Sequence, residues 1–272
     1  VQQHLPTSVK LNRYLPSTPI LLHRHNDYDP PHRNFIRRWI QQRRFKSIDG
    51  IALVSEHSRQ HFLKSWKKYV SFPTFVVPNG IDLSIWKPVE YKDRKDEIIF
   101  VGRAIPEKGA LELAKALAHV LQIYPHFSAR FIFGAPDTHP EYRKQIERIL
   151  SKFNNQIQIN YQISWQEIQS AFQTSAIAVV PSIWDEPFGR TALEAMAGGA
   201  ALISSTRGGL NEVVGDAAVR LTDITPDTIA AALTDLIDHP EKRATLSARG
   251  LEQAKKFTIL LSSGSLYKIL IL

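Results

Sequence analysis

The chain has 272 residues, of which 43% are hydrophobic and 22% are charged, a balance typical of folded globular proteins. It contains no cysteine, so disulfides, thiolate metal sites and cysteine nucleophiles are all excluded. The formal net charge is +8, and no apolar run approaches the roughly 20 residues that a membrane-spanning helix needs.

The excess positive charge lies entirely in the first third of the chain. Residues 1–90 hold 14 lysines and arginines against 6 acids, whereas the remaining residues hold 20 of each. The charge is concentrated in "HRNFIRRWIQQRRFK" (32–46) and "RQHFLKSWKK" (59–68). No nucleic-acid recognition motif accompanies it, so we expect no nucleic-acid partner.

The segment 32–68 allows two interpretations. Ile36, Trp39 and Ile40 share one helical face, and arginines surround them. Such a pattern is typical of an amphipathic surface that makes a peripheral contact with anionic lipid or with an acidic acceptor. It is equally typical of a helix that packs its apolar face on the core and exposes a solvated basic back.

Short apolar runs alternate with helical patterns along the chain, which predicts an α/β fold with a parallel sheet. Early strands are expected within "PILLHRHN" (19–26), "DGIALVSE" (49–56) and "TFVVPNGID" (74–82). After the polar stretch "EYKDRKDE" (90–97), which suggests a domain boundary, further strands are expected at "IIFV" (98–101), "ARFIFG" (129–134), "IQINY" (157–161), "AIAVVP" (176–181) and "AALIS" (200–204).

Two helices in the second part of the chain have clear start signals. Ser164 and Glu167 form a capping-box pattern in "SWQE", in which each side chain can satisfy the other's backbone amide. Thr225 precedes Pro226, which places proline at the first helical position. The apolar tail "FTILLSSGSLYKILIL" (257–272) is expected to form a final helix.

Two glutamates flank a turn in "SIWDEPFGRTALEAMAG", directly after the predicted strand "AIAVVP". Ligands of open parallel sheets bind beyond the carboxyl ends of strands, where Glu186 lies on the turn and Glu194 on the following helix. Gly189 allows the main chain to approach a ligand, and the amides of Arg190 and Thr191 open the helix as an anion site. This layout suits an anionic centre between two polyols, as in a nucleotide-sugar.

The segment "FVGRAIPEKGALELAKAL" (100–117) repeats the order of strand, glycine turn and helix. Arg103 and Lys108 would face the same crevice if both strands belong to one sheet. Two cations there can neutralise the charge that grows on a departing diphosphate. The alternative is that Arg103 caps a helix and Lys108 is solvated.

Four motifs, in order, resemble the retaining GT-B glycosyltransferases of family 4: "PNGID", "FVGR…EKG", "VVPSIWDEPFGRTALEAMAGG" and "STRGGLNEVVGD". The resemblance covers residues 74–256 strongly and extends more loosely back to "LLHRHN" and "LVSEHSRQHF". It implies an α/β fold of two Rossmann-like domains that face each other across a cleft. The sugar donor is then expected to bind mainly to the C-terminal domain.

The resemblance also implies roles, position by position. Arg103 and Lys108 match the basic pair on the donor diphosphate, and Glu186 matches the acid that holds the hydroxyls of the transferred sugar. Glu194 matches the acid on the ribose hydroxyls, and His25 falls near a histidine beside the reaction centre, with His23 or a core histidine pair as alternatives. The implied donor-binding residues are Gly102, Pro187, Phe188, Gly189, Arg190, Thr191 and Glu194.

The implied reaction moves a sugar from a nucleoside diphosphate with retention at the anomeric carbon. A UDP-sugar is the first expected donor and a GDP-sugar the second. The expected acceptor is a cell-surface polysaccharide or lipopolysaccharide-type saccharide, free or lipid-linked, and the expected location is the cytoplasm or the cytoplasmic face of the membrane. We expect no metal or other cofactor, and no glycosidase pair, because cations and a helix start would hold both glutamates ionised.

The chain departs from this family at two places. Its first part is too short for a complete N-terminal domain, so we expect 1–84 to be a truncated remnant of the acceptor-side domain. Residues 85–256 are then the nucleotide-sugar-binding domain, and 257–272 a helix that crosses back towards the first. Gln162 replaces a glycine that is common near the base. A non-catalytic or partner-dependent nucleotide-sugar-binding module is therefore the alternative function.

Overall fold

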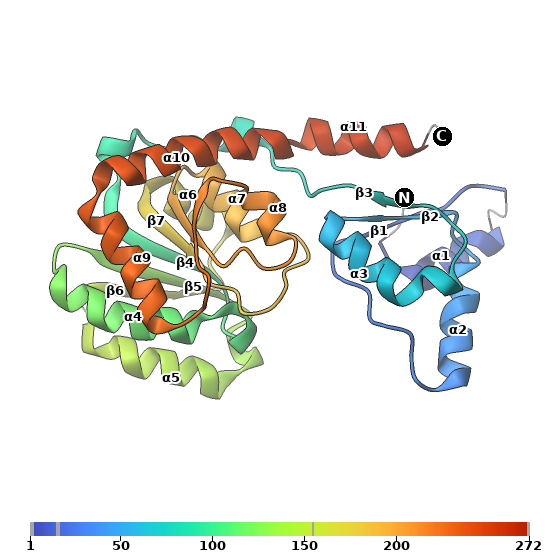
Figure 1. Cartoon of the computed structure of the whole chain (residues 1–272), viewed down its shortest axis with the longest axis horizontal. Helices are drawn as coiled ribbons and strands as arrows, with labels where there is room; N and C mark the ends of the chain where they lie inside the picture. The colour runs from blue at the N-terminus through green and yellow to red at the C-terminus, as the bar shows by residue number, and fades with distance from the viewer. Residues whose placement is uncertain (1–2, 15–16, 154, 271–272) are drawn as a thin grey trace. The chain divides into compact units, whose positions relative to one another are not determined.

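The computed structural model describes residues 3–14, 17–153 and 155–270 (Figure 1). The chain divides into two compact units, one from Val1–Gly80 with Ile259–Leu272 and the other from Ile81–Thr258. The roles predicted for the domains 1–84, 85–256 and 257–272 stay predictions. Those predicted domains also include residues 1–2, 15–16, 154 and 271–272, which lie outside the described residues.

The first unit is built on a small parallel sheet with the strand order β1-β2-β3. Its core is aromatic: Trp66 and Phe62 are fully buried, and the Phe45 ring lies 4.9 Å from that of Trp66. The indole N–H of Trp66 donates to the carbonyl of Asp29 at 2.8 Å, which satisfies its buried donor. Its elements are α1 (Leu5–Tyr14), β1 (Leu21–Arg24), α2 (Phe35–Phe45), β2 (Gly50–Leu53), α3 (Glu56–Trp66), β3 (Thr74–Val76) and α11 (Ile259–Leu270).

Helix α2 tests one of the two interpretations of the basic segment, the one in which its apolar face packs on the core. Phe45 is its one side chain that is buried. Phe35, Ile36, Trp39 and Ile40 are 69%, 64%, 46% and 39% exposed in the first unit. The core-packed interpretation is therefore wrong: the helical periodicity was read correctly, but the apolar face does not lie on the core of this unit.

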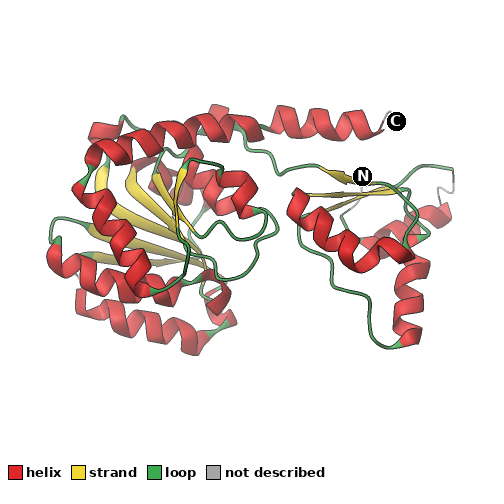
Figure 2. Ribbon diagram, viewed as in Figure 1, coloured by secondary structure: helices red, strands yellow, loops and turns green. Residues whose placement is uncertain are grey.

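The second unit contains a six-stranded parallel sheet in the order β6-β5-β4-β7-β8-β9. Helices α4, α5 and α9 lie along one face of this sheet, and α6, α7 and α10 lie along the other (Figures 1 and 2). The elements are β4 (Lys95–Arg103), α4 (Ala110–Ile123), β5 (Ser128–Gly134), α5 (Pro140–Leu150), β6 (Ile157–Tyr161), α6 (Trp165–Thr174), β7 (Ser175–Val180), α7 (Arg190–Ala197), β8 (Ala201–Ser204), α8 (Leu210–Val214), β9 (Ala218–Arg220), α9 (Pro226–Asp238) and α10 (Pro240–Ala254).

The local signals in the sequence explain where these elements begin. Ser164 and Glu167 form the predicted capping box at α6, and Thr225 caps α9 with proline at its first position. All eight predicted strands are present, and the predicted tail helix begins at Ile259. The ninth strand, β9, was not predicted, because it is short and its sequence, AVR, has no run of apolar residues.

Candidate functional site

Most predicted site residues of the second unit line cavities at the carboxyl ends of β4 and β7, which are neighbours in the sheet, whereas Pro187, Phe188 and Glu194 line neither of the two cavities there. Two cavities open there. A cavity of about 110 Å³ is lined by Lys108, Ser182, Glu186, Gly189, Arg190 and Thr191, among others. A cavity of about 310 Å³ is lined by Gly102, Arg103, Lys108, Gln162, Ile163 and Thr191, among others. Because both cavities include Lys108 and Thr191, they are parts of one site.

Glu186 and Lys108 form the centre of this site. The Lys108 ammonium lies 2.5 Å from Oε1 of Glu186, and their side chains are only 20% and 10% exposed. The Ser182 hydroxyl donates to the same carboxylate oxygen at 2.6 Å. Charge-assisted bonds of this kind are about twice as strong as neutral ones, so the carboxylate is held in one orientation.

Two glycines bring this pair together. Gly109 has φ 66°, and a Cβ there would lie 2.0 Å from the carbonyl oxygen of Pro181, so only glycine fits between the β4–α4 turn and the end of β7. Gly208 has φ 61°, and a Cβ there would lie 2.6 Å from the carbonyl oxygen of Glu186. The next amide, of Gly209, donates to that carbonyl at 2.7 Å. The loop after β8 therefore packs against the Glu186 turn and fixes its position.

The turn runs directly into α7. Gly189 has φ 105° and precedes Arg190, the first residue of the helix. The N–H groups of Arg190 and Thr191 lie in the first turn, where a helix has no internal acceptors for them. Thr191 lines both cavities, so these amides and the positive end of the helix dipole face the site.

Glu194 lies one turn further along α7. Its side chain is 13% exposed, and its carboxylate accepts a hydrogen bond from Nε of Arg190 at 2.8 Å. Burial raises the pKa of Glu194 above its ordinary 4.5, while the Arg190 charge and hydrogen bonds from Arg190 and Trp165 oppose that rise. Glu194 is thus a carboxylate whose desolvation is only partly compensated, as is common in binding sites.

Arg103 and Gly102 end β4 at the rim of the larger cavity. Among the described residues, Arg103 has no carboxylate partner, in contrast to Lys108. Pro187 and Phe188 are buried beside Glu186, and the Phe188 ring packs 5.7 Å from that of Phe257. Phe188 therefore supports the turn with its side chain and can offer a ligand only its backbone.

His25 belongs to the first unit, so it is not among the residues that the second unit brings together. Its Nδ1 lies 2.7 Å from the side-chain oxygen of Asn79, and its ring centroid is 4.5 Å from that of His23. The role predicted for His25 stays a prediction.

Three residues of this site, Ser182, Trp165 and Gly208, were not predicted to contact Glu186 or Glu194. Ser182 stands in the quoted motif, but nothing in its spacing showed that it would contact Glu186. Trp165 was seen only as part of a helix start, yet its side chain bonds Glu194. Gly208 was part of the resemblance, and its positive φ could have been expected from a Gly-Gly pair at a strand end.

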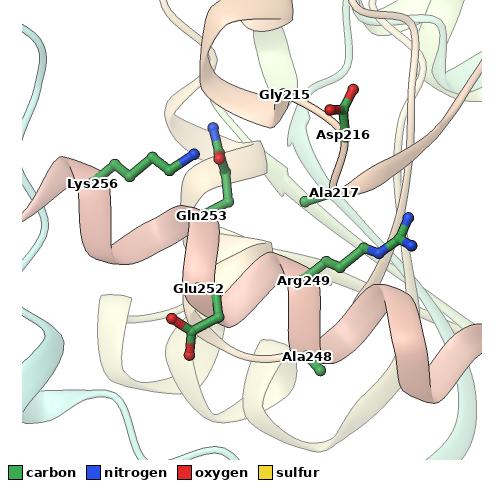
Figure 3. Close-up of a pocket in the computed structure, with 8 residues that line it drawn as sticks. All are labelled: Gly215, Asp216, Ala217, Ala248, Arg249, Glu252, Gln253 and Lys256. Carbon is green, nitrogen blue, oxygen red and sulfur yellow. The ribbon is translucent and has the colours of Figure 1, made fainter.

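A further cavity of about 460 Å³ lies in the second unit, between the turn after α8 and helix α10 (Figure 3). Its charges are mixed. Glu252 is paired with Lys255 at 2.6 Å, and Asp216 lies 3.9 Å from Arg220, while Arg249 and Lys256 have no carboxylate partner among the described residues. This cavity lacks a buried charged side chain, unlike the site at β4 and β7.

Within the described residues, no group of three or more histidines and acids is placed to hold a metal ion. No helix in that same part of the chain combines the length and the apolar character that a membrane crossing requires.

The chain is similar to curated glycosyl-transferring enzymes. It is 26% identical over 243 residues to alpha-maltose-1-phosphate synthase of Mycolicibacterium smegmatis, covering 80% of this chain and 61% of that protein. It is 27% identical over 209 residues to D-inositol 3-phosphate glycosyltransferase of Kineococcus radiotolerans, covering 67% of this chain and 48% of that protein. The chain thus spans about half to three-fifths of the length of these relatives.

Solved structures share the fold. Sucrose-phosphate synthase of Thermosynechococcus elongatus superposes with a TM-score of 0.76 at 22% identity, over 99% of this chain and 72% of that one. HepE of Anabaena, solved with UDP and glucose, gives 0.78 at 19% identity, over 98% and 76%. The predicted α/β fold of GT-B type is confirmed. The sequence pattern of the family described as Glycosyl transferases group 1 matches residues 84–253, well over half of the chain, and the chain therefore belongs to that family.

Proposed function

We propose that this protein transfers a sugar from a nucleoside diphosphate sugar to a saccharide acceptor, with retention at the anomeric carbon. A UDP-sugar is the first expected donor and a GDP-sugar the second. The observation that carries the proposal is the 2.5 Å pair of Lys108 and Glu186 beside the first turn of α7. This pair places one cation and one carboxylate in the same site as the backbone amides of the first turn of α7.

The diphosphate of the donor would lie between the two cations and the start of α7. Lys108 lines both cavities and Arg103 lines the larger one, so the two can contact neighbouring phosphates. The amides of Arg190 and Thr191 add hydrogen-bond donors at the positive end of the helix. These groups are fixed before the reaction, so they stabilise the negative charge that develops on the leaving diphosphate.

Glu186 would hold the hydroxyls of the transferred sugar. When the phosphates attract Lys108, the Glu186 carboxylate can accept hydrogen bonds from the sugar hydroxyls, while Ser182 keeps one oxygen in place. The bond from the anomeric carbon to the diphosphate oxygen breaks, and the acceptor hydroxyl oxygen forms the new bond on the same face of the sugar while its proton passes to the departing diphosphate oxygen. A carboxylate beside the sugar also favours the positive charge of an oxocarbenium-like transition state.

Glu194 would accept hydrogen bonds from the ribose hydroxyls, and the larger cavity would hold the nucleoside. The walls of that cavity include Ile163 and Ile168, which suit the flat apolar faces of a base. We place the protein in family 4 of the GT-B enzymes on its four ordered motifs. In this proposal the cations Arg103 and Lys108 meet the diphosphate without a metal ion.

We propose that the acceptor is a cell-surface polysaccharide or lipopolysaccharide-type saccharide, reached at the cytoplasmic face of the membrane. The segment 32–68 supports this, because α2 exposes Trp39 and three other large apolar side chains. Five arginines lie in or just before this helix, and residues 32–46 contain no acid. Apolar and cationic side chains on one exposed helix are the features of an interfacial helix on anionic lipid.

The test of the proposed function is donor turnover with a stereochemical readout. The protein is incubated with UDP-glucose or GDP-mannose and short saccharide acceptors, and the anomeric proton of the product is followed by NMR. The expected result is an α-linked product from an α-linked donor. An inverted product contradicts the retaining mechanism, and tight donor binding without any transfer would favour the non-catalytic module.

A further inference from the structure

Trp184 places an aromatic ring beside Lys108 at the centre of the candidate site. The Lys108 ammonium lies 5.6 Å from the centroid of the indole, within the range of a cation–π contact. The same ammonium lies 2.5 Å from Oε1 of Glu186, which stands two residues further along the same loop. One loop thus supplies both an aromatic face and a carboxylate to a single lysine, and the proposed function uses only the carboxylate.

The backbone holds the indole in this place. The N–H of Ile183 donates to the carbonyl of Glu107 at 2.8 Å, which ties the Trp184 loop to the turn between β4 and α4. Ser182 and Glu186, at the two ends of this short segment, are both buried. The segment is therefore fixed at its ends and in its middle, although the Trp184 side chain itself is 36% exposed.

An aromatic face suits a lysine that changes its partner. In the proposed function, on which this inference rests, Lys108 moves from the Glu186 carboxylate towards the phosphates of the donor. A lysine side chain has many rotamers, and ordering it on binding opposes affinity. The indole attracts the ammonium through its face and occupies none of the three N–H donors, so its contact is compatible with either partner. Trp184 can therefore keep Lys108 ordered before and after the phosphates arrive.

We infer that Trp184 is a positioning residue, which holds Lys108 in the orientation that the donor diphosphate requires. Its contribution is preorganisation: the lysine loses less freedom when the phosphates bind, because the indole already restricts it. Trp184 lines neither of the two cavities of the site, so its effect on the nucleotide is expected to pass through the lysine.

The test is a double-mutant cycle between Trp184 and Lys108, measured by calorimetric titration with UDP. Trp184→Leu removes the aromatic face, and Trp184→Phe keeps a weaker one. Both are made in the wild-type chain and together with Lys108→Met, which removes the charge and is titrated at higher concentrations of protein and UDP. Tyr161→Leu is the matched control: Tyr161 is 37% exposed, its ring lies 5.4 Å from the Arg143 guanidinium of the same unit, and it lines neither cavity.

Trp184→Leu should weaken UDP binding about two- to fivefold, the strength of one cation–π contact at a partly exposed site, and Trp184→Phe should weaken it less. In the Lys108→Met background neither substitution should have a further effect, and Tyr161→Leu should leave UDP binding unchanged. Unchanged affinity in Trp184→Leu overturns this inference alone. Equal weakening with and without the Lys108 charge also overturns it, because Trp184 would then contact the nucleotide directly. Absence of UDP binding to the wild type overturns the proposed function and this inference with it.

Discussion

Glu186 and Glu194 are both acids in one short segment, yet the structure gives them different partners. Glu186 is paired with Lys108, a cation proposed to contact phosphate, and the largely buried Glu194 is paired with the exposed Arg190. Loss of the Glu186 charge would therefore leave Lys108 available to the nucleotide. Loss of the Glu194 charge would remove a contact to the ribose itself.

This difference predicts opposite behaviour of two isosteric variants. Glu186→Gln should lower the transfer rate by about 100-fold or more, because it removes a group that stabilises the transition state. It should not weaken the binding of UDP. Glu194→Gln should weaken the binding of UDP by at least about tenfold, which corresponds to the loss of a hydrogen bond to a charged group. Titration and initial rates measure both effects. Equal weakening of UDP by the two variants would contradict these assignments.

The raised pKa of Glu194 predicts a pH dependence of nucleotide binding. Because burial raises this pKa above 4.5, Glu194 takes up a proton at a higher pH than an exposed carboxylate does. Once protonated it accepts fewer hydrogen bonds, so UDP affinity should decline as the pH falls through the raised pKa. The contribution of Glu194 to the stability of the second unit grows as the pH falls and is lost as the pH rises through the raised pKa, because the folded state binds this proton more tightly.

Glu194→Gln is the control for this prediction, since its side chain cannot titrate. UDP titrations from neutral pH down towards 4.5 should show a decline in wild type that is absent from the variant. The same decline in both proteins would show that another group, such as the second phosphate ionisation of the ligand, controls binding.

Among elements, the loop after β8 acts on the site through its contacts with the Glu186 turn. Gly208→Ala places a methyl group 2.6 Å from the carbonyl oxygen of Glu186 and strains a positive φ. The Glu186 turn must then move, and a displacement of about 1 Å can cost 100-fold in rate. We expect a large loss of transfer with the second unit still folded.

Gly264→Ala in α11 is the matched glycine substitution, because a Cβ there meets no atom within 4 Å. It should leave transfer unchanged and should stabilise the helix slightly. Circular dichroism and initial rates compare the two variants. Full activity of Gly208→Ala would show that the loop does not position Glu186.

The sequence predicted the strands of both sheets because buried parallel strands are continuous apolar runs, such as Ala176–Val180 within β7. Strand β9 carries no such run and escaped prediction. The apolar face of α2 shows another limit. Periodicity reveals that Ile36, Trp39 and Ile40 share a face, but it does not reveal what covers that face.

The candidate site also has features that the local sequence predicts and features that it does not. The positions of Lys108 and Glu186 beyond neighbouring strand ends could be predicted from short motifs, whereas the roles of these residues and of Glu194 stay predictions. The contact between Lys108 and Glu186 joins residues 78 positions apart, and the fit of Gly208 behind Glu186 depends on a third strand. Contacts of that kind depend on sheet order, which no local pattern encodes.

At the scale of the whole molecule, the exposed face of α2 predicts binding to anionic vesicles. Ile36→Ser with Trp39→Ser should reduce cosedimentation with phosphatidylglycerol vesicles by at least about tenfold, because membrane binding scales with buried apolar area. Ile123→Ser is the matched control, since Ile123 is 67% exposed on α4 of the second unit. Equal binding by all three proteins would exclude α2 as the contact. Binding should also weaken with salt, since arginines contribute to it.

We propose that the second unit binds a nucleoside diphosphate at the carboxyl ends of β4 and β7. Calorimetric titration with UDP tests it directly, in wild type, in Arg103→Ala with Lys108→Ala, and in Arg249→Ala with Lys256→Ala. The second double variant removes two cations from the cavity of about 460 Å³, so both double variants have the same net charge. We predict that the first double variant loses UDP binding and that the second keeps it. Equal loss in both variants, or binding that survives without Arg103 and Lys108, would contradict the assignment of this site.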